Sequence, residues 1–222
     1  MQPRDLKSAP FWIFDLDNTL YPASANLFDE IDRRMCGFIA DYLKIDHAEA
    51  YKVQKSYFRA HGTTLKGLMD RHGMEPGAYL DYVHDVDMSK LARDSRLDRS
   101  LDKLPGRKFI FTNATVSYAL KVLDRLGIGR HFEAIYDIES ARYIPKPEPE
   151  IYADMVGRHG VVPEQSVMVE DVARNLVPAK ALGMTTVWVE TDRSWARADG
   201  EVVTADYTTD DLAAFLAEVT AD

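Results

Sequence analysis

Short, uninterrupted apolar runs that stop at polar residues constrain the fold of this chain more than any other feature. Phe11–Phe14 is apolar without alternation and ends at Asp15, and the segments 109–112 and 167–169 have a similar character. Runs of this kind are typical of strands that are buried on both faces of a sheet. Amphipathic helical patterns alternate with them, as at 116–126, over short connections. This alternation predicts an α/β fold with a parallel sheet covered on both faces.

The segment from residue 21 to residue 104 has a different pattern. Apolar residues recur there at helical spacing, and no strand of comparable quality interrupts them. We therefore predict an all-helical domain of residues 21–104, inserted into an α/β core made of residues 1–20 and 105–222. The remaining core elements that we predict are strands at 135–138 and 185–189 and a last helix at 212–219.

The charge balance limits the possible partners. The formal net charge is −9, and an acidic surface argues against nucleic-acid polymers and anionic membranes, because both require basic patches. The one cysteine, Cys36, leaves no intrachain disulfide and fits a reducing cytoplasm, which is the location that we expect. Residues 1–10 contain no apolar signal core. No apolar run approaches the ~18 residues of a membrane span, so no membrane association is expected.

Polar side chains follow three of the predicted strands, and one lysine lies between two prolines on a later loop. The candidates, in chain order, are Asp15 and Asp17, Thr112 and Asn113, Lys146, and Glu170 and Asp171. The carboxyl ends of parallel strands meet at one edge of a sheet, which is where α/β sheets bind ligands. We therefore expect these side chains to lie close together.

Carboxylates in this group favour a metal site. Asp15, Asp17 and Asp171 would repel one another, and each would raise the pKa of its neighbours. A divalent cation removes that conflict, and ligands that offer only oxygen suit Mg²⁺. A carboxylate beside a bound phosphate can also attack it. The carboxylates therefore predict a magnesium site with a nucleophile in it.

The remaining polar residues favour a phosphate site. Lys146 and the polar groups of Thr112 and Asn113 would hold phosphate oxygens. Each residue taken alone has a simpler interpretation, since an aspartate after a strand is most often a turn residue or a helix cap. Their joint occurrence at the ends of strands in one sheet is much more specific.

Residues 15–20 read DLDNTL and match the DxDxT signature of the haloacid dehalogenase-like hydrolase superfamily. That superfamily has three later motifs. This chain resembles them, in the right order, at Thr112, at Lys146, and at Glu170-Asp171 with Asn175. The resemblance spans nearly the whole chain. It implies a Rossmann-like core and makes the helical insert a cap over the active site.

The resemblance implies a role for each acidic residue. Asp15 would be the nucleophile and a magnesium ligand. Asp17 would be the general acid and base, and its backbone carbonyl would bind the same ion. Asp171 would be the third protein ligand, and Glu170 would bind directly or through water.

Thr112 and Lys146 would bind the phosphate, and Asn113 would help through its backbone. The implied reaction is the magnesium-dependent hydrolysis of a phosphomonoester through an aspartyl-phosphate.

A finer resemblance concerns the substrate. Residues 15–22 read DLDNTLYP and residues 111–114 read FTNA, which is similar to the bacterial and fungal pyrimidine 5′-nucleotidases. This implies a nucleoside monophosphate, UMP or CMP, as the substrate. We expect the loop at 62–66 to face the active site. The candidate specificity residues are Tyr21, Thr63, Thr64 and His84.

Other readings stay open beside this one. Phosphoglycolate phosphatase is the main alternative, because its core motifs would look the same. Haloacid dehalogenases need neither a second aspartate nor magnesium, so Asp17 argues against them. Sugar phosphomutases usually carry a different pair in place of Asn18 and Thr19. A non-catalytic binding protein is disfavoured because Asp15, Asp17 and Asp171 are all present. The oligomeric state is left open.

Overall fold

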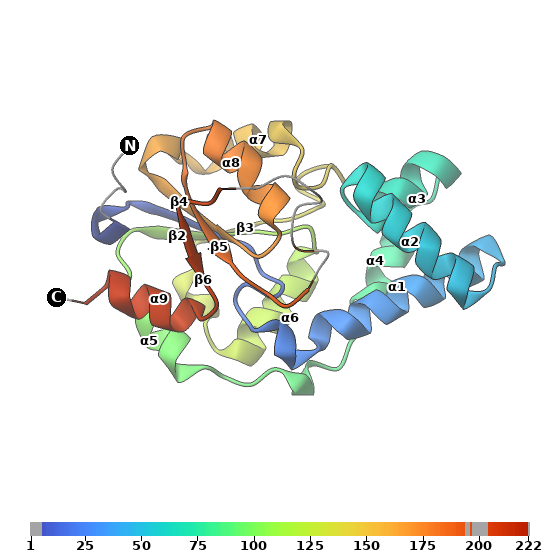
Figure 1. The fold of residues 1–222 in the computed structure, drawn as a ribbon, viewed down its shortest axis with the longest axis horizontal. Helices are drawn as coiled ribbons and strands as arrows, with labels where there is room; N and C mark the ends of the chain where they lie inside the picture. The colour runs from blue at the N-terminus through green and yellow to red at the C-terminus, as the bar shows by residue number, and fades with distance from the viewer. Residues whose placement is uncertain (1–5, 194–195, 197–203, 222) are drawn as a thin grey trace.

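The computed structural model describes residues 6–193, 196 and 204–221. In this part of the chain, six strands form one sheet in the order β3-β2-β1-β4-β5-β6, and every neighbouring pair is parallel (Figure 1). The strands are β1 Phe11–Phe14, β2 Arg107–Phe111, β3 Ala134–Tyr136, β4 Ser166–Glu170, β5 Thr185–Val189 and β6 Tyr207–Thr209. The predicted α/β class with a parallel sheet is confirmed.

Strand β1 lies in the middle of the sheet, because its side chains are apolar on both faces. Phe14 pairs with Ile110 of β2 on one side and with Val169 of β4 on the other. The next residue continues this pairing, since the Asp15 amide donates to the Val169 carbonyl at 2.9 Å. The residues that follow β1, β2 and β4 therefore emerge side by side at one edge of the sheet.

Helices cover both faces of the sheet. Successive strand residues point to opposite faces, so Ile13 packs with the buried Tyr152 and Phe14 with the buried Tyr118. Figure 1 shows α7 and α8 on one side of the sheet and α5, α6 and α9 on the other. These helices are α5 Ser95–Lys103, α6 Val116–Leu126, α7 Pro149–His159, α8 Leu176–Ala181 and α9 Leu212–Val219.

Four further helices come between β1 and β2 in the sequence. They form a separate lobe at the right of Figure 1. They are α1 Leu27–Leu43, α2 His47–His61, α3 Thr64–His72 and α4 Pro76–Val83. The lobe has an aromatic core of its own, in which the rings of Phe38 and Tyr79 meet edge to face with their centroids 5.1 Å apart. We call α1–α4 the cap.

Helix α5 precedes β2 but lies against α9 of the core. Ser100 Oγ donates to the Ala213 carbonyl at 3.1 Å, and Arg96 pairs with Asp211 at 2.8 Å. The division at residues 20 and 105 stays a prediction, and the place of α5 favours an earlier end for the cap.

The structure adds one strand to those predicted from the sequence, β6 at the sheet edge. Helix α6 ends at Gly127, which has the left-handed φ of 76°. Within the described ranges, no helix has both the length and the apolar character that crossing a membrane requires.

Candidate active site

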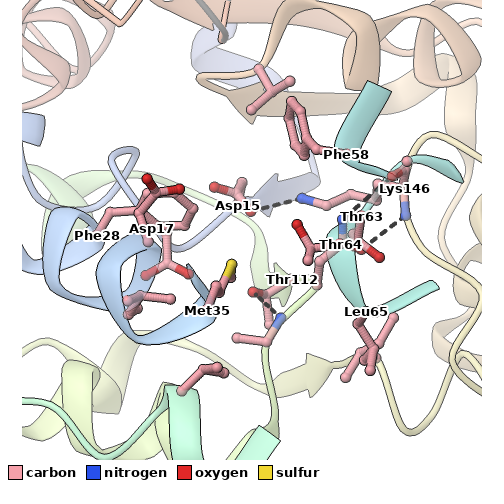
Figure 2. A pocket seen from close by; sticks show the side chains of 18 of the residues that line it. Asp15, Asp17, Phe28, Met35, Phe58, Thr63, Thr64, Leu65, Thr112 and Lys146 are labelled. Atoms are coloured by element: carbon pink, nitrogen blue, oxygen red, sulfur yellow. Dashed lines mark hydrogen bonds and ion pairs between the residues drawn. The ribbon is translucent and has the colours of Figure 1, made fainter. Parts of the chain in front are cut away.

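Asp15 and Lys146 form the centre of the site. The Lys146 ammonium lies 2.7 Å from Asp15 Oδ1, a contact that Figure 2 shows. It also lies 2.7 Å from Glu170 Oε2 and 2.8 Å from the Phe111 carbonyl oxygen. Burial by itself lowers the pKa of Lys146, but the adjacent carboxylates Asp15 and Glu170 raise it above its ordinary value. The lysine therefore stays charged, although only 1% of it is exposed.

Asn113 holds the loop that carries Lys146. The Lys146 amide donates to Asn113 Oδ1 at 2.8 Å, and Asn113 Nδ2 donates back to the Lys146 carbonyl at 3.4 Å. Pro145 and Pro147 flank the lysine and restrict its backbone. The side chain of Asn113 thus positions Lys146, while the predicted backbone contact of Asn113 with phosphate stays a prediction.

Three buried carboxylates gather beside the lysine. Asp15, Glu170 and Asp171 offer ligand atoms that all lie within 4.8 Å of one another. Among the described residues, Asp171 Oδ2 is buried and has no hydrogen-bond partner. Burial raises the pKa of Asp171 well above its ordinary value, and the charge of Asp15 raises it further. A charged oxygen in this position is costly unless a cation binds it.

The donor set suits magnesium. It consists of carboxylate oxygens, which Mg²⁺ prefers. Glu170 is already fixed, because its Oε1 accepts a hydrogen bond from Asn175 Nδ2 at 2.7 Å. Burial raises the pKa of Glu170 to about 7. The residues therefore fit a divalent cation held by Asp15 and Asp171, with Glu170 beside it.

The side chain of Asp17 does not belong to this cluster. Its Oδ1 accepts hydrogen bonds from the Tyr21 hydroxyl at 2.5 Å and from the Tyr118 hydroxyl at 2.7 Å. Burial, and then the charge of Asp15, raise the pKa of Asp17 to about 6. The next residue, Asn18, has the left-handed φ of 58°. This arrangement is compatible with metal binding through the Asp17 carbonyl, which stays a prediction.

Two buried threonines, Thr19 and Thr112, follow the strands at the site. Thr19 Oγ1 donates to Asp15 Oδ2 at 3.2 Å, so both oxygens of Asp15 have partners. Thr112 is 2% exposed at the end of β2, and its Oγ1 accepts a hydrogen bond from the Ala114 amide at 3.0 Å. Thr112 therefore lines the same cavity as Asp15 and Lys146.

This cavity lies between the carboxyl ends of the strands and the cap. From the core it is lined by Asp15, Asp17, Thr112, Asn113, Lys146, Glu170, Asp171 and Arg174. The cap contributes a largely apolar wall, part of which Figure 2 shows: Phe28, Ile31, Met35, Phe58, Leu65, Tyr79, Leu80 and Val83. The site is therefore covered by an apolar surface that can exclude water.

Three of the four candidate specificity residues line the cavity, namely Thr63, Thr64 and His84. Both threonines also stabilise the cap, since Thr63 Oγ1 accepts from the Lys66 amide at 3.1 Å and Thr64 Oγ1 donates to the Gln54 carbonyl at 3.3 Å. The fourth candidate, Tyr21, is outside the lining. Its buried hydroxyl binds Asp17 instead.

Gly62, in the short connection between α2 and α3, contacts the loop that carries Lys146. Gly62 has a φ of 81°, and a Cβ there would lie 3.1 Å from Pro145 Cγ and 3.3 Å from the Lys146 carbonyl oxygen. A residue with a Cβ would be strained by this φ and would crowd both atoms, so the position favours glycine.

Comparison with known proteins identifies the family. A family model described as haloacid dehalogenase-like hydrolase matches residues 12–183. The chain belongs to this family. It is a hydrolase of the phosphatase type, and the resemblance of its motifs to this superfamily is confirmed.

Two of three curated relatives of the hydrolase carry the names of phosphatases. Glyceraldehyde 3-phosphate phosphatase of Methanopyrus kandleri is 30% identical over 191 residues, which are 79% of this chain and 81% of the relative. Phosphoglycolate phosphatase of Mesorhizobium japonicum is 25% identical over 84% of this chain and 86% of its own length. Phosphate metabolism protein 8 of Saccharomyces cerevisiae is 27% identical over 78% of this chain, but the match spans only 59% of the yeast protein.

Solved structures share the fold of the hydrolase. The phosphate complex of CbbY from Rhodobacter sphaeroides has a TM-score of 0.66 and 18% identity, with 92% of this chain and 95% of that chain covered. The magnesium-bound YfnB of Bacillus subtilis, described as a putative HAD-hydrolase, has a TM-score of 0.62 and 16% identity, with 96% and 99% covered. These likenesses support the cap-and-core fold.

Two residues of the hydrolase site were missed from the sequence. Tyr118 lies on α6, where a tyrosine counts as part of the apolar helix face. Arg174 lies between the predicted Asp171 and Asn175. Its Nη2 donates to the carbonyls of Phe58 at 3.1 Å and Gly62 at 2.9 Å. The proximity of Arg174 to the fourth motif was the one available signal.

Proposed function

We propose that this hydrolase is a magnesium-dependent phosphatase of small phosphorylated metabolites and that Asp15 attacks the phosphorus. One observation carries the proposal: in a buried cluster, Asp15 Oδ1 lies 2.7 Å from the Lys146 ammonium, and Asp15 shares a possible ion site with Asp171, whose Oδ2 has no partner among the described residues. The names of two relatives, glyceraldehyde 3-phosphate phosphatase and phosphoglycolate phosphatase, support this substrate class. The magnesium in the YfnB structure supports the choice of ion.

The proposed reaction has two displacements. In the first, an oxygen of Asp15 bonds to phosphorus, the ester P–O bond breaks, and the departing oxygen takes a proton from Asp17. In the second, water attacks the phosphorus and gives a proton to Asp17, and Asp15 leaves as inorganic phosphate forms. Lys146 and Thr112 would bind the phosphoryl oxygens throughout. Magnesium, when bound by Asp15, Asp171 and the Asp17 carbonyl, supplies positive charge to the same oxygens.

The leaving group is a second question, and part of the cap wall favours a neutral, hydrogen-bonding group. Asp32 Oδ1 accepts from Lys55 Nζ at 2.6 Å and from Gln54 Nε2 at 2.7 Å, so the charge of Lys55 is neutralised. Gln54 Oε1 is buried and has no partner within the described part of the chain. All three residues line the cavity. A pyrimidine base could bond to Gln54 and lie against Phe28 or Phe58.

The side of the cavity that the core lines favours the alternative, a phosphatase of phosphoglycolate or a similar small metabolite. Arg174 places a guanidinium on the cavity wall, 4.1 Å from the centroid of the Phe58 ring. A small substrate with a second anionic group, such as phosphoglycolate, could pair with it. The names of the relatives favour this alternative over UMP or CMP.

A panel of phosphomonoesters tests both levels of the proposal. Phosphate release would be measured from UMP, CMP, AMP, GMP, phosphoglycolate, glyceraldehyde 3-phosphate and p-nitrophenyl phosphate, with magnesium or with excess chelator. We expect release that requires magnesium and that Asp15→Asn abolishes. Preference for UMP and CMP over the purines would support the pyrimidine nucleotidase reading, and preference for phosphoglycolate would support the alternative. Undiminished release in chelator would refute the metal, and full activity of Asp15→Asn would refute the nucleophile.

A further inference from the structure

We propose that Tyr21 and Tyr118 hold the carboxyl group of Asp17 so that its acidic proton faces the substrate, and that His84 of the cap keeps Tyr118 in place. The inference rests on the proposed function, in which Asp17 protonates the leaving group. It gives Tyr21 and His84 positioning roles in place of the specificity roles expected from the sequence.

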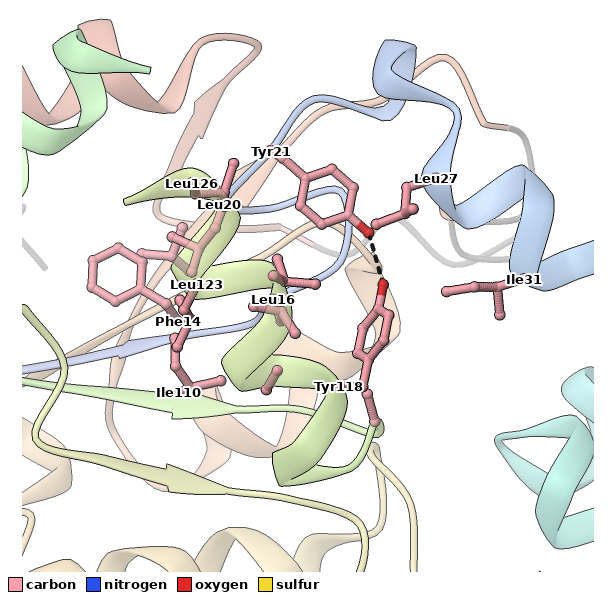
Figure 3. Close-up of a cluster of buried hydrophobic side chains, with 14 of the residues drawn as sticks. Phe14, Leu16, Leu20, Tyr21, Leu27, Ile31, Ile110, Tyr118, Leu123 and Leu126 are labelled. Carbon is pink, nitrogen blue, oxygen red and sulfur yellow. Dashed lines mark hydrogen bonds between the residues drawn. The ribbon is translucent and has the colours of Figure 1, made fainter. Parts of the chain in front are cut away.

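Both tyrosines bind the same oxygen of Asp17. Tyr21 comes from the segment after β1 and Tyr118 from α6, and Figure 3 shows the two hydroxyl groups facing each other. The hydroxyl oxygens are 3.4 Å apart, which is longer than the 2.5 Å and 2.7 Å that separate them from Asp17 Oδ1. Each hydroxyl has one hydrogen, and the shorter distances assign both hydrogens to Asp17 Oδ1.

This pair of bonds determines where a proton on Asp17 can lie. A carboxylate oxygen that accepts two hydrogen bonds has little capacity to carry a proton as well. The proton is therefore left on Oδ2. Among the described residues, Asp17 Oδ2 has no hydrogen-bond partner, and Asp17 lines the cavity. The tyrosines thus leave the acidic oxygen free for the substrate.

The cap fixes one of the two tyrosines. The ring of His84, at the end of α4, stacks on the ring of Tyr118 with centroids 4.5 Å apart and planes at 22°. The Nδ1 atom of His84 also lies 3.4 Å from Thr115 Oγ1, which accepts from the Tyr118 amide and caps α6. The position of the cap is therefore transmitted to Tyr118 and through its hydroxyl to Asp17.

The step that depends on this arrangement is the first displacement. An oxygen of Asp15 forms a bond to phosphorus, the electron pair of the ester P–O bond goes to the departing oxygen, and that oxygen takes the Oδ2 proton of Asp17. Without the two hydroxyl donors, the carboxyl group can rotate and the proton can lie on either oxygen. An alkoxide leaving group needs this proton, whereas p-nitrophenolate leaves readily without it.

Leaving-group dependence tests the inference. We would measure kcat/KM of Tyr118→Phe and Tyr21→Phe with the best alkyl phosphate of the panel and with p-nitrophenyl phosphate. This constant reports the steps through departure of the leaving group. We expect a loss of about tenfold or more for the alkyl ester, within the range of general acid catalysis, and about twofold or less for p-nitrophenyl phosphate. Tyr136→Phe is the matched control, because its buried hydroxyl binds Asp154 outside the cavity.

His84 variants test the contribution of the cap. We expect His84→Leu to show the same selective loss, and His84→Phe, which keeps a ring to stack on Tyr118, to recover most of it. Thermal melting would check that each variant folds, and the two tyrosine variants test the same oxygen independently.

The possible failures can be told apart. If the wild type releases phosphate but the tyrosine variants lose both esters equally, or lose neither, the inference is wrong and the proposed function stands. If the wild type releases phosphate from no ester, the proposed function is wrong and the inference falls with it.

Discussion

Lys146 lies between Asp15 and Glu170, at 2.7 Å from an oxygen of each, and so carries the positive charge of a buried acidic site. Lys146→Met would leave these carboxylates and Asp171 without a counter-charge. Removing one partner of a buried ion pair costs about 3–5 kcal/mol, so we expect a large loss of stability in chelator. Magnesium should restore part of it. The measurement is thermal melting with and without magnesium.

The control for this prediction is Lys66→Met, which breaks a surface pair with Asp70. Exposed pairs contribute about 0–1 kcal/mol, so its melting temperature should change little. If magnesium raised the melting temperature of Lys146→Met no more than that of the wild type, lysine and ion would not share one site.

Gln54 offers a prediction about selectivity. Its amide oxygen is buried without a partner in the described part of the chain, and the residue lines the cavity. If a pyrimidine bonds to it, Gln54→Met should lower kcat/KM for UMP or CMP by about tenfold, because a hydrogen bond made in a dry site is lost. The value for p-nitrophenyl phosphate should hardly change. Gln165→Met, at an exposed position, is the control. Equal losses with all esters would argue against base recognition.

Gly62→Ala tests the contact between the cap and the loop that carries Lys146. The residue has a φ of 81°, and its new Cβ would approach Pro145 to 3.1 Å and the Lys146 carbonyl to 3.3 Å. A positive φ costs at least about 1–2 kcal/mol for a residue with a Cβ, and the ψ of −40° places Gly62 outside the left-handed helical region. We expect that cost in denaturant unfolding and, in addition, a loss of kcat from displacement of Lys146.

Gly73→Ala separates these two effects. Gly73 also has a positive φ, 61°, but a Cβ there would meet no atom within 4 Å. Because Gly73 is in the left-handed helical region, Gly73→Ala should lose about 1–2 kcal/mol of stability and keep its activity. Equal activity in the two variants would show that the contact at Gly62 does not position Lys146.

Because His84 is buried, we expect the stability of the protein to depend on pH. Burial, and then the charge of Lys121, lower its pKa from 6.5 to about 4. The unfolded state therefore binds a proton more readily. The contribution of neutral His84 to stability is complete above pH 6.5 and is lost as the pH falls through 4. The difference corresponds to about 3 kcal/mol. In urea unfolding at pH 7 and at pH 4.5, His84→Phe should lose less stability on acidification than the wild type does. Parallel losses would contradict the shifted pKa.

The sequence predicts the centre of this molecule better than its periphery. Strand β1 and the polar residues after β1, β2 and β4 were predictable, because a parallel sheet brings the carboxyl ends of its strands together. Strand β6 was not, since its three residues at the sheet edge form no buried apolar run. The packing of α5 against α9 depends on contacts across more than one hundred residues, such as Ser100 with Ala213. Local patterns contain no information about such pairs.

The candidate site was predictable to a similar extent. Asp15, Lys146 and Asp171 were expected together and lie together on one cavity. The sequence does not show the direction of a side chain, so Tyr21 was expected to line the cavity but instead binds Asp17. Tyr118 was invisible because a buried tyrosine and an apolar core residue occupy the same positions in a helical pattern.

The short turn Ala173–Asn175 contacts both the cap and the acidic cluster of the active site. Arg174 of this turn holds the cap through the Phe58 and Gly62 carbonyls, and Asn175 holds Glu170. Asp171 lies only two residues before the turn. Any swing of the cap away from the sheet must break both bonds of Arg174 and pull on the segment that carries an ion ligand. The departure of product and the loosening of the ion would then be parts of one movement.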